Sequence, residues 1–195
     1  WQKLAEEYGA DHSRREKMFA DKFDDWADVR VPAGTNWMQS GLGLSRPNRA
    51  GDFAVAYEGE QIVASILLAG LHTNVTTDKL NGSLRSPWLP VEKKFVSLQL
   101  LGDRRSMVRI VVDSCGLNEF AGGGLDYLAG AGGTTKWKTF STSPAPSQRS
   151  FIELTTRSDN PRWPDRPGRA GTTDGKELEG YRSSFGVMRA VLHDD

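Results

Sequence analysis

The sequence predicts an all-β protein, a jelly-roll β-sandwich with an α-helical extension at its N-terminus. Short segments in which apolar and polar residues alternate recur along the chain, and glycine, proline or asparagine separates them. Successive side chains of a strand point to opposite faces, so each segment offers one apolar face to a core. We expect about eight such strands, near the number in a jelly roll, where two antiparallel sheets pack face to face.

The clearest strand pattern lies in the middle of the chain. Apolar residues alternate over 96–100 and again over 108–112, on either side of a charged turn at 102–105. Gly102 and Asp103 supply the permissive backbone that this turn needs. We expect both strands in an antiparallel sheet that has one packed and one wet face.

Further strands are expected on both sides of this centre. The alternation over 53–57 and 62–68, with a glycine in the loop between, indicates a hairpin. Later strands are expected over 136–140, 151–156 and 184–192.

The N-terminal part of the chain is expected to be a separate helical element over residues 1–30, with the jelly-roll domain over 31–195. Apolar residues recur on one helical stripe between charges over residues 1–29. The stripe weakens over residues 9–15, so a break in the helix would fall there. Val31-Pro32-Ala33-Gly34 ends the helix. This helix either docks on the sandwich or connects to a neighbouring domain.

Composition excludes several classes of function. The 195 residues suit one globular domain with an appendage, and Lys+Arg and Asp+Glu are both 25, so the charge balance predicts no nucleic-acid partner. No apolar run reaches the ~20 residues of a membrane span. The single Cys115 forms no internal disulfide, and without C-x-x-C-H no haem is expected on this chain. Because it starts at Trp1, we expect a piece of a larger protein.

Two segments carry a resemblance to a known family. Gly82-x-Leu84-x-Ser86-Pro87, followed by a strand and then by 108–113 (VRIVVD), resembles the levan-binding jelly-roll modules of fructan hydrolases. From about Gly51 to Asp195 the chain more closely resembles a carbohydrate-binding-type domain of the large c-type-cytochrome proteins of planctomycetes. The resemblance implies a non-catalytic module that targets a larger extracytoplasmic protein, periplasmic or at the cell surface, to polysaccharide or oligosaccharide.

The resemblance also implies a sugar site around the strand at 108–112. In the resembled modules an arginine and acidic residues near this strand grip the sugar, which points here to Arg109, Asp113 and Glu119. The alternative is an ion pair between neighbouring strands. A second candidate cluster is Arg157, Asp159, Asn160 and Trp163, in a proline-rich stretch that cannot be a regular helix or a central strand. There the alternative is that Asp159 and Asn160 satisfy the amides of their own turn.

Aromatic residues are the other means of holding a sugar. Trp37, Trp88, Trp137 and Trp163 are the candidates, and Trp163, among prolines and charges, is the one expected to be exposed. A tryptophan is more often packed in a core or at an edge than used as a binding platform.

Calcium is the metal expected if one binds. Jelly-roll modules that resemble this chain often hold a structural calcium where the first and last strands meet, and calcium needs hard oxygen ligands. Asp52 and Asp194 are the candidate ligands. The alternative is that both are solvated.

No pattern of a catalytic site is present, so we expect no enzyme. The three histidines His12, His72 and His193 have no nearby partner at metal-binding spacing, and neither G-x-S-x-G nor a local Cys–His signature occurs. The glycine-rich stretch 116–133 lacks G-x-x-x-x-G-K-[ST], which argues against nucleotide binding. The alternative to glycan binding is a structural domain that docks neighbouring domains of its parent.

Overall fold

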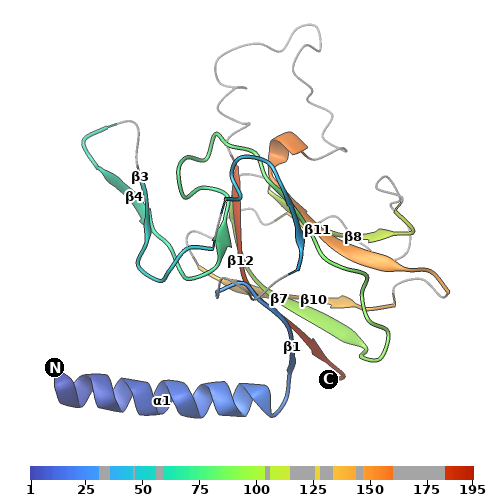
Figure 1. The fold of residues 1–195 in the computed structure, drawn as a ribbon, viewed down its shortest axis with the longest axis horizontal. Coiled ribbons are helices and arrows are strands. Elements are labelled where there is room, and N and C mark those ends of the chain that lie inside the picture. The colour runs from blue at the N-terminus through green and yellow to red at the C-terminus, as the bar shows by residue number, and fades with distance from the viewer. Residues whose placement is uncertain are drawn as a thin grey trace, which may run out of the picture.

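A computed structural model describes residues 1–30, 36–45, 47–55, 59–103, 106–114, 126–127, 134–143, 147–159 and 183–195. Within them the chain is an all-β sandwich with one N-terminal helix (Figure 1). All strand pairs are antiparallel. This is the predicted fold class.

One layer of the sandwich, named sheet A here, has the strand order β1-β12-β7-β10, and β5 also pairs with β12. Its strands in the described chain are β1 (Asp24–Asp28), β5 (Leu71–His72), β7 (Phe95–Asp103), β10 (Lys136–Ser141) and β12 (Ser184–His193). The long strand β12 lies at its centre and pairs with β7 from Ser184 to His193.

The other layer, named sheet B, has the order β2-β6-β11-β8-β9. Its strands in the described chain are β2 (Met38–Ser40), β6 (Ser83–Arg85), β8 (Met107–Val112), β9 (Asp126–Tyr127) and β11 (Ser150–Thr155). A separate hairpin is formed by β3 (Phe53–Val55) and β4 (Val63–Ile66), as predicted, and a short 3-10 helix, η1, covers Arg157–Asp159.

The path of the chain between the layers is that of a jelly roll. From β6 onward the described strands alternate between sheet B and sheet A, and among them only β8 and β9 follow one another in the same layer. The apolar faces of both layers therefore meet in one core, which includes Val96, Leu98, Val108, Ile110 and Leu154. Burying each such side chain contributes roughly 1.5–3 kcal/mol relative to leaving it exposed.

The two central strands correct one prediction. β7 and β8 do not lie in a common sheet, because β7 pairs with β10 and β12 whereas β8 pairs with β11 and β9. Their apolar faces meet across the core instead. Alternation defines which face of a strand is buried, but it is the same whether the strand turns back in its own sheet or crosses to the other one.

The helix α1 (Gln2–Ala20) is shorter than predicted at its C-terminal end and shows no break at Gly9. The predicted helix over 1–29 is wrong beyond residue 20, and from Asp24 the chain forms β1 at the edge of sheet A. There Trp26 packs against the buried Trp37, with ring centroids 5.3 Å apart. Tertiary packing overrides the helical periodicity at this point.

No residue of α1 is buried, and its N-terminal end extends away from the sandwich (Figure 1). Only the last turns touch sheet A, where the Phe19 ring lies 5.7 Å from that of Trp137. Among the described helices none has the length and apolar content to cross a membrane.

Candidate functional site: the outer face of sheet B

Three charged side chains stand in a row on the outer face of sheet B. Strand register places Glu153 of β11 directly opposite Arg85 of β6 on one side and Arg109 of β8 on the other. Their sequence neighbours Leu84 and Ile110 point into the core. The polar positions of three apolar strands are thereby gathered in the middle of one face.

Glu153 connects the two arginines. Arg85 Nε donates to Glu153 Oε1 at 2.6 Å, and Arg109 Nε donates to Oε2 at 2.7 Å. The side chains of Glu153 and Arg109 are 2% and 6% exposed, whereas that of Arg85 is 52% exposed. Arg109 and Glu153 are therefore a buried pair that fixes the geometry, and Arg85 is the member that faces solvent.

Two hollows open beside this row. A hollow of about 370 Å³ is lined by the row, by Met38, Ser40 and Ser83, and by Asp159. A second hollow of about 510 Å³ shares the row and extends to Asn36, Pro87, Trp88, Ser114 and Phe151. Volumes of 300–1,000 Å³ are typical of small-ligand sites.

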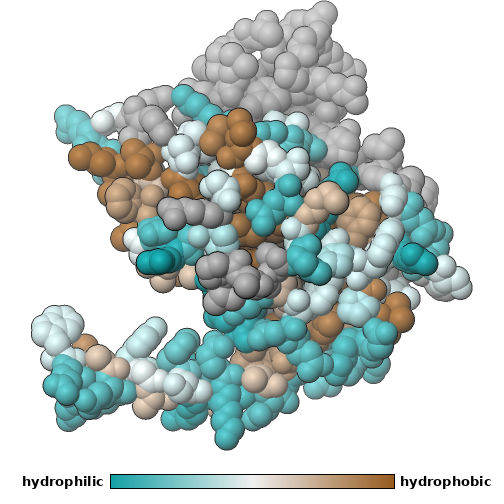
Figure 2. Space-filling view, viewed as in Figure 1, coloured by the Kyte–Doolittle hydropathy of each residue, from teal (hydrophilic) through white to brown (hydrophobic). Residues whose placement is uncertain are grey.

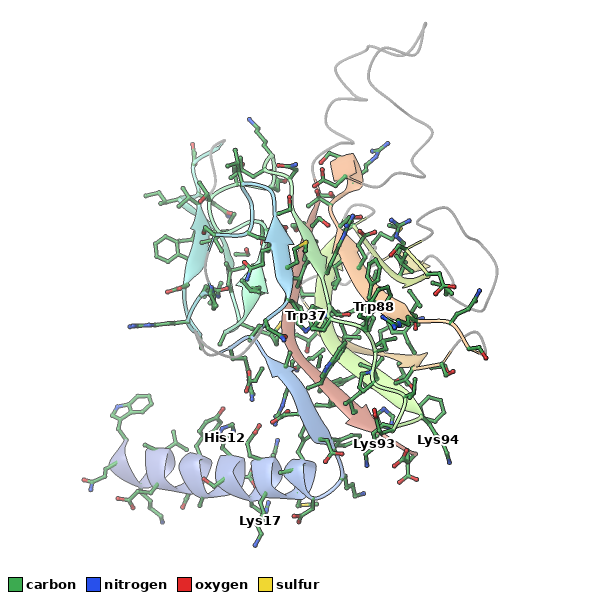
Figure 3. All side chains as sticks on the ribbon, turned by 45° about the vertical axis from the view of Figure 1, so that its right-hand side comes forward. His12, Lys17, Trp37, Trp88, Lys93 and Lys94 are labelled. Carbon is green, nitrogen blue, oxygen red and sulfur yellow. The ribbon has the colours of Figure 1, made fainter. Side chains whose placement is uncertain are left out.

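Trp88 provides an aromatic surface in the larger hollow. It is 45% exposed, and Phe151 of β11 packs edge-on against it with the ring centroids 5.7 Å apart. The Arg149 guanidinium lies 5.9 Å from the Trp88 ring centre. Figure 3 labels Trp88 on the β11 side of the sandwich, while the labelled Trp37 lies in the interior.

Arg109 and Asp113, the two predicted sugar residues around β8 that the structure describes, do not come together. Arg109 is in the site, but its carboxylate partner is Glu153 and not Asp113. Asp113 is exposed beyond the end of β8, with a positive φ of 47°, and its Oδ1 accepts from the Arg149 amide at 3.1 Å. Asp113 therefore closes a turn. Glu119 lies outside the described residues.

The second predicted cluster is represented by two residues. Asp159 lines the smaller hollow, and its Oδ1 accepts from the Asn81 side chain at 3.1 Å. Arg157 is buried at the start of η1, where its amide donates to the Ser183 hydroxyl at 2.7 Å. Asn160 and Trp163 lie outside the described residues.

The two aspartates predicted to hold calcium have other partners. Asp52 Oδ2 accepts from the Arg49 amide at 2.9 Å. Asp194 pairs with Lys93 at 3.1 Å and accepts from the Lys94 amide, and these contacts hold the pKa of Asp194 below its usual value. In the part of the chain that the structure describes, no three His, Cys, Asp or Glu side chains gather around a metal position. Shared calcium at Asp52 and Asp194 stays a prediction.

Sequence reasoning missed Glu153, Arg85 and the position of Trp88. Glu153 is a charged residue in the middle of an apolar strand, Ser150–Thr155, and that contrast is the signal that could have found it. Arg85 lies within the segment that carries the family resemblance, between Leu84 and Ser86. Trp88 was one of the aromatic candidates, without a preference over Trp37 and Trp137.

Comparisons with known proteins give distant likenesses. No protein-family model and no curated protein matches this chain. Among solved structures, it is similar to TmCBM61 in complex with beta-1,4-galactotriose, at 11% identity and a TM-score of 0.44 over 87% of this chain and 95% of that chain.

A second similar structure is the K1 cleaved adhesin domain of Lys-gingipain from Porphyromonas gingivalis W83. The identity is 10% and the TM-score 0.34, over 85% of this chain and 93% of that chain. Likenesses at these TM-scores carry no argument about what this chain binds.

Proposed function

We propose that this chain is a non-catalytic glycan-binding module of a larger protein and that it holds that protein on polysaccharide. The outer face of sheet B carries the proposal, because it combines a fixed arginine–glutamate row with a half-exposed tryptophan in one hollow. Sugars offer hydroxyl groups to planar polar side chains and C–H faces to aromatic rings. Anchoring raises the effective concentration of the parent protein's other domains near the polymer.

The test is affinity electrophoresis of the whole chain through gels that contain soluble polysaccharides. The Trp88→Ala variant is expected to lose the retardation that the wild-type chain shows. Trp137→Ala is a matched control, because Trp137 is also 45% exposed but lies on β10 of sheet A. Retardation that survives Trp88→Ala and is lost with Trp137→Ala would place the site on the wrong layer.

A second function is favoured by a separate observation, namely apolar side chains exposed on two elements. Trp1, which precedes α1, and Leu4 and Tyr8 on α1 are 101%, 58% and 74% exposed. Hydrophobic surface also gathers over the β3–β4 hairpin (Figure 2), where Phe53 and Ile66 are 50% and 75% exposed. Patches of this kind mark contacts with other proteins. The second candidate is therefore a structural domain that docks neighbouring domains of its parent.

The same gels separate the two candidates, because a purely structural domain is retarded by no polysaccharide. The proposal also includes an extracytoplasmic location and a large c-type-cytochrome protein as the protein to which this module belongs. Their support is the sequence resemblance of residues 51–195. Release of reducing ends from a bound glycan would contradict the non-catalytic part of the proposal.

A further inference from the structure

We propose that the glycan bound on the outer face of sheet B is acidic and that Arg85 binds the carboxylate of one of its uronic acid residues. This inference rests on the glycan-binding function proposed above. It follows from which donors and acceptors of the Arg85–Glu153–Arg109 row are already used inside the protein.

Arg85 has donors to spare. Its Nε is bound to Glu153, and in the described residues the two terminal amino groups, Nη1 and Nη2, donate to no protein atom. Its side chain lines both hollows and is 52% exposed. The end of a guanidinium presents two parallel N–H groups, and this spacing matches the two oxygens of a carboxylate.

The acceptors of the row, by contrast, are turned away from solvent, because the Glu153 side chain is 2% exposed and both of its oxygens already accept from arginines. Glu153 Oε1 accepts from Arg85 and Oε2 accepts from Arg109. An ionised carboxylate only accepts hydrogen bonds, so it fits a row that has donors left over, whereas a neutral sugar also needs acceptors for its hydroxyl protons.

The larger hollow suits the acidic sugar better than the smaller one. Asp159 lines the smaller hollow and repels an anion there. In the larger hollow Glu153 is the only acidic residue in the described lining, and both arginines neutralise it. Trp88 and Phe151 offer an apolar surface to the sugar ring, and Asn36 and Ser114 in the same lining can bind its hydroxyl groups.

Isothermal titration calorimetry tests this inference with polygalacturonate, alginate and hyaluronate, each beside its carboxyl-reduced form. Reduction removes the charge and leaves the rest of the chain of sugars in place. The wild-type chain is expected to bind at least one acidic polymer about tenfold to a hundredfold more tightly than its reduced partner, the range for charge-assisted hydrogen bonds. Added salt weakens only the acidic member of the pair.

Substitutions locate the preference. Arg85→Gln is expected to remove the difference in affinity between acidic and reduced polymers. Arg85→Lys keeps the charge but not the two parallel N–H donors, so it should retain only part of this difference. Arg14→Gln is the matched control: Arg14 is 71% exposed on α1, so the charge change is the same at a distant position. A preference that Arg14→Gln reduces as much as Arg85→Gln would overturn the inference.

Other outcomes separate this inference from the proposed function. Equal affinity for acidic and reduced polymers, abolished by Trp88→Ala, would leave the glycan-binding function standing and refute the acidic ligand. Binding to neutral polysaccharides alone would likewise refute the acidic ligand and leave the glycan-binding function standing. Binding to no polysaccharide of either kind would refute both.

Discussion

The two outer faces of the sandwich each carry an arginine bound to carboxylates, and the two arginines differ in what they leave open. On sheet A, Arg189 donates from Nε and Nη2 to both oxygens of Asp25 at 2.6 and 2.8 Å, and from Nη1 to Glu16 at 2.9 Å. Its guanidinium also lies 4.2 Å from the ring centre of Phe19. On sheet B, Arg85 uses only Nε.

This difference separates a structural arginine from a binding one. The Arg189 side chain is 7% exposed and connects β12, β1 and the end of α1, so its charge and its donors are consumed inside the fold. The Arg85 side chain is half exposed and directs its free end into two hollows. Residue type and charge are the same, and the two roles are distinguished by the exposure of the side chain and by the number of donors left over.

The largest loss of stability is expected when the buried Arg109–Glu153 pair beneath Arg85 is broken. Glu153→Gln takes from the buried Arg109 a carboxylate partner, and breaking such a pair costs about 3–5 kcal/mol. Differential scanning calorimetry should show a melting temperature lower by roughly 10 °C. Combining Glu153→Leu with Arg109→Met replaces the pair by apolar side chains and should recover much of this loss. An unchanged melting temperature in Glu153→Gln would mean that the row is not a structural unit.

The next largest loss of stability is expected on acidification, because a histidine is buried in sheet A. His72 of β5 is 1% exposed, and burial lowers its pKa to about 4, although the hydrogen bond between Nε2 and the Leu68 carbonyl at 3.0 Å opposes this shift. The unfolded chain binds a proton at this histidine near pH 6.5 and the folded chain only near pH 4. Stability is therefore complete above pH 6.5 and falls as the pH drops toward 4, by about 3 kcal/mol at most.

Urea unfolding across this pH range measures the effect. His72→Gln should lose less stability on acidification than the wild type, because glutamine does not take up a proton and its amide can still donate to Leu68. His12→Gln on the exposed helix is the control and should follow the wild-type curve. Parallel curves for the wild type and His72→Gln would show that His72 does not contribute to the acid sensitivity.

The smallest effect tests the two arginines directly. Arg189→Met removes hydrogen bonds to two carboxylates that are themselves 47% and 38% exposed, so the loss is expected to be about 2 kcal/mol. Amide hydrogen exchange should become faster over residues 16–20, where α1 is held. Arg85→Met should change the free energy of unfolding by only about 0.5 kcal/mol. Equal losses of unfolding free energy in the two variants would remove the distinction between Arg189 as a structural arginine and Arg85 as a binding one.

The sequence by itself determined the strands and their buried faces. Alternation located β7, β8, β10, β11 and β12 to within three residues at either end, because each strand must bury one apolar face and this need is local. The hairpin β3–β4 followed from the same pattern and its glycine-containing loop. The core-facing side chains of β7 and β8 were those predicted, although the two strands lie in different layers. The predicted wet face of β8 was wrong, because Met107, Arg109 and Val111 on that face are 0%, 5% and 3% exposed.

Only the tertiary structure decided the partners. Glu153 is 44 residues from Arg109 and 68 from Arg85, and the three meet because β11 lies between β8 and β6 in one register. A strand offers the same alternating pattern to any neighbour, so strand order and register arise from packing of the whole core. The same packing buries Trp37 and leaves Trp88 half exposed, a difference that residue type and local sequence do not encode.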